Sequence, residues 1–315
     1  MGGAGFLAAQ QVEDLTVYGL KGPSGLALIQ LFENPPRAAG FNIRVEALAQ
    51  ADLMAAKFIS GEAKIGILPP NVAAKIASSG KRIQAAAVTG TGMLSLLSAD
   101  PGVRRFEDLK GKSVEVAGQG ATPDYVFRKI LLSKGIDPDR DLRLGYSLAY
   151  PEIAQSLIAG RVSLALLPEP FATMARAGNG ALNLVGDIQD EWAKLQAGKL
   201  PAGASPAANY PMTLLVVDGD FAASHPSLMR VLLGDVKNSV EWVVGHPAEA
   251  GRLAEKHELG LRAQVVSAAV PRSNYVFLPA SAARQSLEAL FEAFLEFAPV
   301  SIGGALPGDS FYYRY

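Results

Sequence analysis

The chain has 315 residues, 49% of them hydrophobic, which is enough to build two domains of ordinary size or one large domain. Its 29 basic and 30 acidic residues give a net charge of -1 and form no long run of one sign, which argues against a nucleic-acid-binding or polybasic membrane-binding surface. The sequence has no cysteine, which excludes disulfides, thiolate nucleophiles and cysteine-based metal sites. No apolar run reaches the roughly 18 residues that a membrane-spanning helix needs.

The amino-terminal stretch MGGAGFLAAQQVEDL is small and flexible in composition. It lacks the basic segment that opens a signal peptide. We interpret residues 1–12 as the remnant of a leader or as a tether, and an upstream signal or lipid-attachment sequence in the full gene would decide between them.

The next part of the chain contains a repeat. Val17 aligns with Val116 and Gly19 with Gly118, an offset of 99 residues without a gap. At this offset LTVYGLKGPSGLALIQLFE lies over VEVAGQGATPDYVFRKILL, and each predicts a strand, a glycine-containing turn and a helix. NIRVEALAQ then lies over DLRLGYSLA, and both have the alternating apolar residues of a strand.

The repeat continues through a further strand and helix. DLMAAKFISGEAKIGILPPNVAAKIA and PEIAQSLIAGRVSLALLPEPFATMAR each predict an amphipathic helix ended by glycine, a buried strand, a turn at Pro69 or Pro168, and another helix. Identities alone are too few to prove common ancestry, because all α/β units share this pattern. In either case the pattern predicts an α/β fold with two mostly parallel sheets flanked by helices, one lobe near residues 13–92 and one at 93–210.

The repeat is lost in the remaining chain. QAGKLPAGASPAANYP has the composition of a linker that crosses between lobes. MTLLVVD predicts a strand, and the following residues predict two helices divided at His246-Pro247 and a further helix in SAARQSLEALFEAFLEFAPV. Because this mostly helical tail has no partner sheet of its own, we assign 211–315 to the first lobe. Hinges are then expected near Thr91-Gly92 and Tyr210-Pro211.

Two lobes joined by two crossings enclose a cleft, and ligands of open parallel sheets bind at the carboxyl ends of the strands. The candidate loops are residues 19–25, 68–71, 89–92, 118–122, 146–150 and 168–171. Lys21 either pairs with an acidic solute or is a solvated lysine, and Glu169 either faces the cleft or holds the hinge. Tyr146, Tyr150 and Phe171 either stack on a planar ligand or pack in the fold.

Nucleotide-binding motifs are absent from the glycine-containing loops. A dinucleotide-binding G-x-G-x-x-G would need glycine at position 123, where the sequence has Pro123. GKS at 111–113 resembles the end of a P-loop, but position 106 is Phe106 and the residues precede a strand. These loops are therefore not interpreted as nucleotide sites.

A nucleophile elbow is also unsupported. GYSLA at 145–149 ends in Ala149 where the elbow motif needs glycine. Ser147 as a nucleophile would need a histidine, and His225, His246 and His257 all lie in the tail, with no two spaced for a metal.

Four blocks of the sequence resemble a known family: VYGLKGPSGLAL, GEAKIGILPPNVAAKI, FEDLKGKSVEVAGQGATPDYVFRKILLSKGIDPDRDL and IAGRVSLALLPEPFAT. They are similar to ABC-transporter substrate-binding proteins of the nitrate, sulfonate and taurine group, which also includes binding proteins for thiamine precursors. The resemblance covers nearly the whole chain. It implies a two-lobed periplasmic-binding-protein type II fold.

The resemblance also implies a solute site in the interlobe cleft. The ligand-binding residues expected by position are Lys21, Pro23, Ser24, Pro69, Pro70, Asn71, Thr89, Gly90, Gln119, Gly120, Ala121, Thr122, Tyr146 and Glu169. In the loop 118–122, backbone N–H groups and the Thr122 hydroxyl would be offered to the solute. No arginine lies clearly in a cleft loop to clamp a sulfonate, and the proline-rich turns suit a small organic, planar molecule.

The function implied is a periplasmic or other extracytoplasmic binding protein, lipid-anchored or free, that delivers a small organic or anionic solute to an ABC-transporter permease. We expect a monomer without cofactor, metal or nucleic acid. The alternative is an enzyme, because the scaffold also resembles dehydratases of menaquinone synthesis and fungal pyrimidine synthases. Catalysis would need a convergent acid–base set, for which the cleft offers Lys21, Glu169 and Tyr146. A regulatory effector domain is disfavoured because no DNA-binding helix-turn-helix precedes residue 13.

Overall fold

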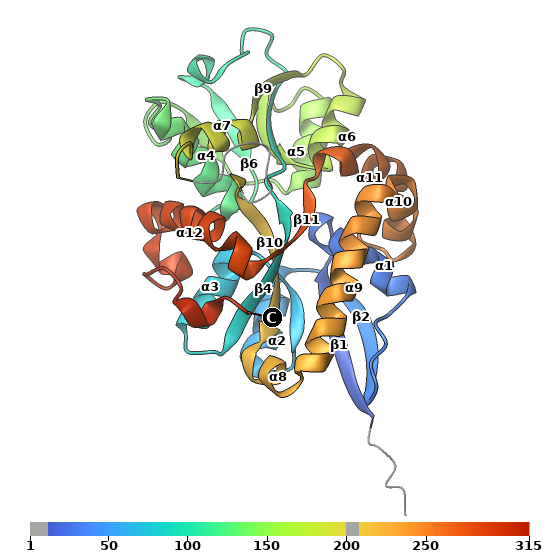
Figure 1. Cartoon of the computed structure of the whole chain (residues 1–315). Helices are drawn as coiled ribbons and strands as arrows, with labels where there is room; N and C mark the ends of the chain where they lie inside the picture. The colour runs from blue at the N-terminus through green and yellow to red at the C-terminus, as the bar shows by residue number, and fades with distance from the viewer. Residues whose placement is uncertain (1–11, 200–207, 315) are drawn as a thin grey trace, which may run out of the picture.

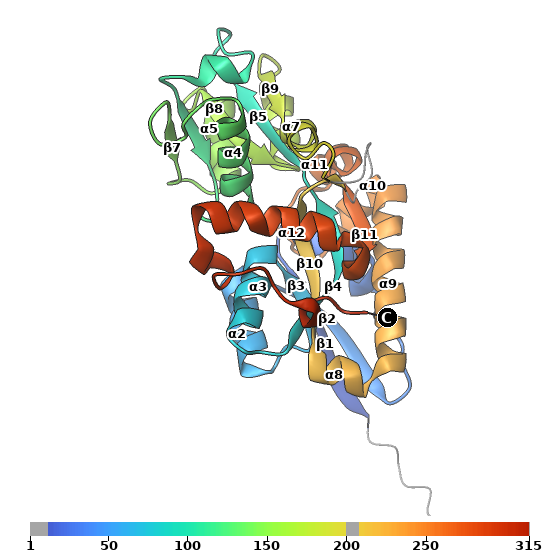
Figure 2. The ribbon, with the colours of Figure 1, turned by 60° about the vertical axis from the view of Figure 1, so that its left-hand side comes forward.

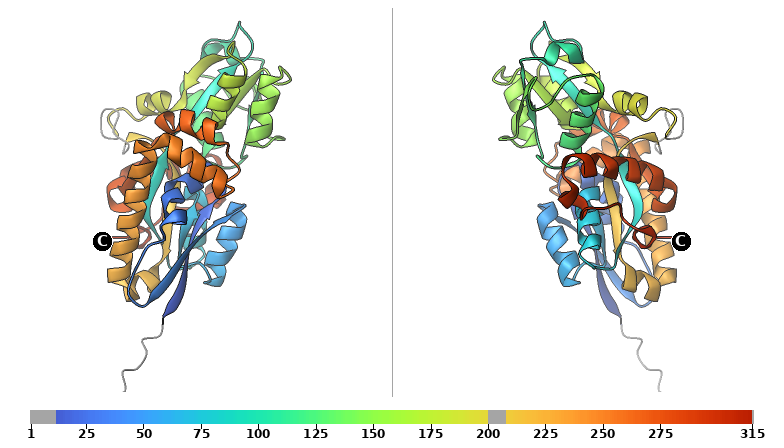
Figure 3. Two further views of the ribbon diagram at one scale, coloured as in Figure 1. Left: turned by 90° about the vertical axis from the view of Figure 1, so that its right-hand side faces the viewer. Right: turned by 90° about the vertical axis from the view of Figure 1, so that its left-hand side faces the viewer.

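The computed structural model describes residues 12–199 and 208–314 (Figure 1). Nearly all of the expected leader or tether, and the centre of the expected linker, lie outside the described residues. Two α/β lobes are stacked one above the other, and the side views of Figure 3 show the same stacking from both directions. None of the helices in the described ranges combines the length and hydropathy that crossing a membrane requires.

The first lobe is built on a six-stranded sheet in the order β11-β4-β10-β3-β1-β2. Its strands are β1 (Glu13–Leu20), β2 (Phe41–Leu48), β3 (Ile65–Leu68), β4 (Ile83–Thr91), β10 (Pro211–Asp218) and β11 (Tyr275–Pro279). β1 is parallel to β2 and β3, and β10 is antiparallel to both β3 and β4. β4 therefore runs in the same direction as β1, β2 and β3, and only β10 and β11 oppose them within this sheet.

The second lobe is built on a five-stranded sheet in the order β7-β6-β8-β5-β9. Its strands are β5 (Leu94–Ser98), β6 (Ser113–Val116), β7 (Arg143–Gly145), β8 (Leu164–Pro168) and β9 (Asn183–Asp187). β6 is parallel to β7 and β8, whereas β5 is antiparallel to β8 and β9. Both sheets are thus mostly parallel with an antiparallel strand inside, which confirms the expected fold class.

The two sheets share one strand order. β4-β10-β3-β1-β2 in the first lobe corresponds to β9-β5-β8-β6-β7 in the second. The offset of 99 residues places β1 on β6, β2 on β7, β3 on β8 and β4 on β9. In each sheet the antiparallel strand is the one that enters directly after a crossing between lobes, so the repeat seen in the sequence is a repeat of topology.

Helices cover both faces of each sheet. In the first lobe, Figure 2 shows α2, α3 and α12 on one face and α9 on the other. These helices are α1 (Ile29–Glu33), α2 (Ala51–Ser60), α3 (Pro70–Ser78), α8 (Gly219–Ser224), α9 (Pro226–Gly245), α10 (Pro247–Lys256), α11 (Ala263–Ala269) and α12 (Ala280–Phe297), with 3-10 turns η1 (Pro23–Leu28), η4 (Val270–Arg272), η5 (Pro299–Ile302) and η6 (Asp309–Phe311). The second lobe has η2 (Phe106–Leu109), α4 (Thr122–Ser133), α5 (Tyr150–Ile158), α6 (Phe171–Gly178) and α7 (Ile188–Leu195).

The tail differs from its sequence-based description in one element. The sequence analysis missed β11, which pairs antiparallel with β4 at the edge of the first sheet. The strand has five residues and lies between helices, and its partner is far away in the sequence. A short strand of this kind forms because a sheet edge is available, which local periodicity does not reveal.

The lobes contact each other on two flanks. On one flank the Tyr125 ring of α4 meets Phe294 of α12 edge-on at 4.9 Å and stacks on Phe297 at 5.7 Å, and Lys129 pairs with Glu296. On the other flank α6 contacts α11. One apolar cluster there includes residues of both lobes, among them Leu26 of η1 and Leu167 of β8. The lobes therefore form a continuous packed structure.

Candidate functional site

Strand direction brings the carboxyl ends of both sheets face to face. β4 passes to β5 through Gly92 and Met93, and β1, β2 and β3 end at the same edge as β4. In the second sheet β6, β7, β8 and β9 run opposite to β5, so they end where β5 begins. The loops after these strands consequently meet between the lobes, the region that we call the cleft.

The two crossings pack tightly against each other. A Cβ atom added at Gly92 would lie 2.4 Å from Cζ of Tyr210 and 2.6 Å from Oδ1 of Asn209, so only glycine fits there. The Gly92 carbonyl accepts hydrogen bonds from the amides of Asn209 and Asn274. The fully buried Tyr210 donates its hydroxyl to Gln189 at 2.6 Å. These contacts join the segments at which the sequence places the hinges.

The second-lobe loop at 118–122 holds a carboxylate from its own helix. Gly118 and Gly120 have positive φ angles of 78° and 74°, and the turn carries the chain into α4. The Gly120 N–H donates to Oδ2 of Asp124 at 2.9 Å, and the Ala121 N–H donates to the Gly118 carbonyl. This corrects the expectation that the N–H groups of Gly120 and Ala121 are open to a solute, because both are already bonded within the loop.

The same carboxylate orders the neighbouring loop. Asp124, 2% exposed, also accepts from Nε of Arg128 and from the Tyr146 hydroxyl, at 2.8 and 2.7 Å. Burial, followed by the hydrogen bond to Asp124, raises the pKa of Tyr146 above its usual range. Arg128 reaches on to Asp139 at 2.8 Å. The Tyr146 hydroxyl is therefore committed to this network, which fixes the loops after β6 and β7 relative to each other.

Two predicted residues carry buried oxygen atoms without a partner. Oγ1 of Thr122, in the first turn of α4, and Oδ1 of Asn71, in the first turn of α3, are both buried and accept no hydrogen bond from the described residues. Thr122 is 3% exposed. A buried polar atom left unpaired costs free energy, so these two atoms favour a bound polar group at the helix starts.

The other residues expected to bind solute lie in or beside the cleft loops. Lys21 is exposed after β1, and Pro23 and Ser24 begin η1, where the Pro23 carbonyl accepts the Tyr275 hydroxyl at 2.8 Å. Pro69 precedes α3 and Pro70 occupies its first turn. Thr89 and Gly90 are buried in β4, and the Thr89 hydroxyl lies 3.0 Å from that of Thr213. Gln119 is exposed in the second-lobe loop.

Glu169 lies beside the crossings. It borders a cavity of about 750 Å³, which we call the hinge pocket. The hinge pocket is lined by Thr91, Met93, Ser95, Glu169, Arg176, Leu184, Asp187, Gln189, Asp190, Ala193, Lys194, Ala208, Asn209, Arg272, Asn274, Tyr275 and Val276. Glu169 follows β8 at the cleft edge of the second sheet and also borders this pocket, so its position fits both alternatives.

Burial controls the charge of Glu169. The side chain is 4% exposed, and its carboxylate accepts the Thr173 N–H at 3.0 Å. Burial raises the pKa of Glu169, and the bonds to Thr173 and the positive charges of Arg272 and Arg176 oppose that rise. The proton is therefore held more tightly than on a solvated glutamate.

Sequence reasoning missed Arg176 and Arg272. Arg176 lies in α6, two turns beyond Glu169, and Arg272 lies in η4 just before β11. Neither residue is in a loop that directly follows a strand, and the sequence analysis took its candidates only from such loops. The spacing of Arg176 from Glu169 is a local signal, whereas Arg272 reaches the pocket only through tertiary folding.

Two aromatic candidates pack on each other. The rings of Tyr150 and Phe171 are stacked with centroids 5.7 Å apart. Each of the three histidines has a protein partner: His225 bonds to the Phe221 carbonyl and His246 to the Trp242 carbonyl within the same part of the chain, and His257 bonds to the distant Glu33 carboxylate. Within residues 12–199 and 208–314, no group of three acidic, histidine or cysteine side chains is placed to hold a metal ion.

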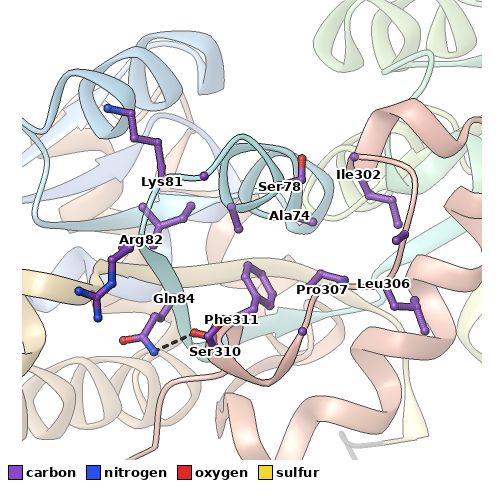
Figure 4. A pocket seen from close by; sticks show the side chains of 17 residues that line it. Ala74, Ser78, Lys81, Arg82, Gln84, Ile302, Leu306, Pro307, Ser310 and Phe311 are labelled. Atoms are coloured by element: carbon purple, nitrogen blue, oxygen red, sulfur yellow. Dashed lines mark hydrogen bonds between the residues drawn. The ribbon is translucent and has the colours of Figure 1, made fainter.

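Another pocket, of about 400 Å³, lies at the opposite end of the first lobe (Figure 4). It is bordered by the end of α3, the start of β4 and the carboxyl-terminal segment, where Gln84 donates to the Ser310 carbonyl at 2.9 Å. Figure 4 shows Lys81 and Arg82 extending away from it. None of the residues expected to bind solute lines this pocket.

The profile of the NMT1-like family matches residues 64–256. This range covers more than half of the chain, so the chain belongs to the NMT1-like family. No curated protein sequence is detectably similar to it.

Several solved structures with the same fold are described as ABC-transport proteins. An ABC transporter protein from Parabacteroides distasonis has a TM-score of 0.77 at 24% identity, covering 95% of this chain and 98% of that one. The periplasmic aliphatic sulphonate-binding protein SsuA of Escherichia coli gives 0.72 at 15% identity, with 96% and 92% covered. The periplasmic nitrate-binding protein NrtA of Synechocystis gives 0.56 at 12% identity, with 81% and 69% covered. The fold is that of the type II periplasmic binding proteins.

Proposed function

We propose that this protein is an extracytoplasmic solute-binding protein that delivers a small solute to the permease of an ABC importer. The observation that carries the proposal is the arrangement of the two sheets, which share a strand order and turn the loops at their carboxyl ends toward each other across two crossings. Such a cleft lets one solute contact both lobes. The family membership and the descriptions of the similar structures support the same function.

The proposed solute site lies at the starts of α3 and α4. Asn71 from the first lobe and Thr122 from the second supply buried oxygen atoms that lack a partner in the described residues, and Pro23, Ser24, Pro69 and Gln119 lie in the loops after β1, β3 and β6. A solute that donates a hydrogen bond to Asn71 and contacts the Thr122 hydroxyl would satisfy both atoms. We propose a small, polar organic molecule or anion.

Lobe closure would convert binding into a signal. We propose residues 13–92 with 211–315 and residues 93–210 as the moving bodies, with hinges at Thr91-Gly92 and Tyr210-Pro211. A solute that contacts both lobes stabilises the closed form through contacts that exist only there, and the permease senses that form. The alternative of an enzyme on this scaffold is weaker, because the similar structures are described as binding proteins.

A thermal-shift screen tests the proposal. Purified protein would be heated with nitrate, bicarbonate, alkyl sulfonates, thiamine pyrimidines and aromatic acids, and each hit would be recovered and weighed. A ligand at 100 times its dissociation constant adds about 2.7 kcal/mol of stability. We expect a hit that is recovered unchanged and is weakened in Thr122→Val. A hit recovered with a different mass would instead establish an enzyme.

A further inference from the structure

Helix α4 connects the second-lobe loop at 118–122 with the first lobe. Thr122 and Asp124 lie in the first turn of α4, and the Asp124 carboxylate accepts the Gly120 N–H of the loop. The side chain of Tyr125 passes beside the same loop, because a Cβ atom added at Gly120 would lie 3.6 Å from the Tyr125 hydroxyl. Two consecutive residues of α4 therefore contact the loop.

The Tyr125 ring packs against α12 of the first lobe. It stacks on Phe297 with ring centroids 5.7 Å apart and an interplanar angle of 2°, and it meets Phe294 edge-on at 4.9 Å. Phe294 is fully buried, so the ring rests on a fixed part of the first lobe. One turn further along α4, Lys129 pairs with Glu296 of α12. We call these five residues the flank contact.

The flank contact and the proposed solute site separate together. α3 and α12 lie on the same face of the first sheet (Figure 2), and the unpaired Asn71 oxygen lies in the first turn of α3. Thr122 and Tyr125 lie within one turn of α4. A rigid movement of the second lobe that carries Thr122 away from α3 therefore also carries Tyr125 away from α12.

We propose that the flank contact is a latch that stabilises the closed arrangement of the lobes, with Tyr125 as the positioning residue that joins the latch to the loop at 118–122. The latch consists of protein side chains alone, so it acts whether or not a solute is bound. It raises the fraction of molecules in the closed form and thereby the apparent affinity for a solute. This inference rests on the lobe movement of the proposed function and not on the identity of the solute.

The aromatic rings should supply most of the stabilisation. Ring edges and faces attract each other, so an aromatic pair contributes more than the area that it buries. Lys129 and Glu296 are 32% and 40% exposed, and an ion pair at such a position contributes little and is screened by salt. Loss of the Tyr125 ring should shift the ratio of closed to open molecules roughly tenfold, and loss of the ion pair about twofold.

Distance measurements between two spin labels on the whole protein test the proposal. Because the sequence has no cysteine, Asp52→Cys in α2 of the first lobe and Arg161→Cys after α5 of the second would provide the only labelled positions. Both side chains are exposed. Double electron–electron resonance without added solute would then give the fractions of closed and open molecules.

Variants of the latch should change these fractions in a fixed order. Tyr125→Leu and Phe297→Leu should each raise the open fraction, and the double variant should open no further than Tyr125→Leu, because both changes remove one stacked pair. Tyr125→Phe should restore the wild-type distribution, since it keeps the ring. Lys129→Gln should have a smaller effect, which high salt should reproduce in wild type. Phe311→Leu is the matched control, because Phe311 packs against Phe291 within the first lobe.

Two outcomes would overturn the proposal. The first is a distance distribution of Tyr125→Leu equal to that of the Phe311→Leu control. The second is an opening in Tyr125→Phe as large as in Tyr125→Leu, which would assign the effect to the hydroxyl and not to the stacked ring.

The latch and the proposed function can fail separately. If Tyr125→Leu opens the lobes and the thermal-shift screen finds no solute, the latch stands and the proposed function fails. If the screen finds a solute and the latch variants keep the wild-type distances, the proposed function stands and the latch is wrong.

Discussion

The two lobes share a strand order but are assembled from the chain in different ways. All five strands of the second sheet lie between Leu94 and Asp187. The first sheet takes β10 and β11 from beyond residue 210, and β10 lies between β3 and β4. Without the tail, β4 has no neighbour in the first sheet. The strand contacts of the second lobe are therefore local in sequence, whereas those of the first lobe are long-range. Folding of the first lobe should depend on the carboxyl-terminal part of the chain, and folding of the second lobe should not.

The lobes also differ in how their cleft loops are fixed. In the second lobe a charged network of Asp124, Arg128 and Tyr146 joins the loops after β6 and β7. In the first lobe the loop after β3 is fixed by Pro69 and Pro70 at the start of α3. Proline presets the backbone, whereas the network depends on buried hydrogen bonds. The second lobe should thus be more sensitive to polar substitutions at its loops.

Dividing the chain into fragments should have the largest effect on folding. We expect a fragment of residues 93–199 to unfold cooperatively on heating, because it contains the whole second sheet and its helices α4 to α7. A fragment of residues 12–92 should not, since β4 has lost β10 and β11. Circular dichroism melting of the two fragments measures this. If the fragment of residues 12–92 melted cooperatively and the fragment of residues 93–199 did not, the proposed difference between the lobes would be wrong.

The crossing between the lobes should be the next most sensitive position. Gly92→Ala should lower the free energy of unfolding by about 2–3 kcal/mol, because the added Cβ meets the Tyr210 ring and the Asn209 side chain. Gly234→Ala in α9 is the matched control, since nothing lies within 4 Å of its Cβ position. This control should gain roughly 0.5–1 kcal/mol from helix propensity. Urea unfolding of both variants measures these changes in the free energy of unfolding. Equal changes in the two variants would contradict the prediction.

One buried threonine in each lobe allows the contribution of its hydroxyl to stability to be compared. Thr89→Val should cost about 1 kcal/mol, because it removes the hydrogen bond to Thr213 in the first lobe. Thr122→Val should leave stability unchanged or raise it by up to about 1 kcal/mol, because its buried hydroxyl has no partner in the described residues. Denaturant unfolding at one pH compares them. A larger loss for Thr122→Val would reveal a structural role for that hydroxyl.

Glu169 should give the smallest effect, visible as a pH dependence. Position 169 corresponds to Pro70 in the first lobe at the offset of 99, so only the second lobe buries a carboxylate there. Burial raises its pKa above the ordinary value of 4.5. The neutral form is therefore favoured on folding, and stability is lost as pH rises through the raised pKa. Glu169→Gln should be more stable relative to wild type at pH 7 than at pH 4.

Unfolding experiments at several pH values would measure the Glu169 effect. Glu107→Gln is a suitable control because that glutamate is exposed. A difference between wild type and Glu169→Gln that stays constant from pH 4 to pH 7 would mean that the carboxylate is as well solvated as in the unfolded chain.

The sequence by itself determined the repeated part of the fold. Apolar alternation, glycine turns and prolines after buried strands gave β1 to β3 and β6 to β8 with their helices, because these signals are local. They also located the cleft loops, since loops at the carboxyl ends of parallel strands meet at one edge. The buried atoms of Asn71 and Thr122 lie in those loops.

Only the tertiary structure decided the rest. It placed β11 beside β4, bound the Gly120 N–H and the Tyr146 hydroxyl to the same Asp124 carboxylate, and brought Arg272 to the pocket that contains Arg176. Each of these relations joins residues on different elements. Local periodicity encodes which face of an element is apolar, whereas the partner of a sheet edge, a carboxylate or an arginine is set by packing between distant segments.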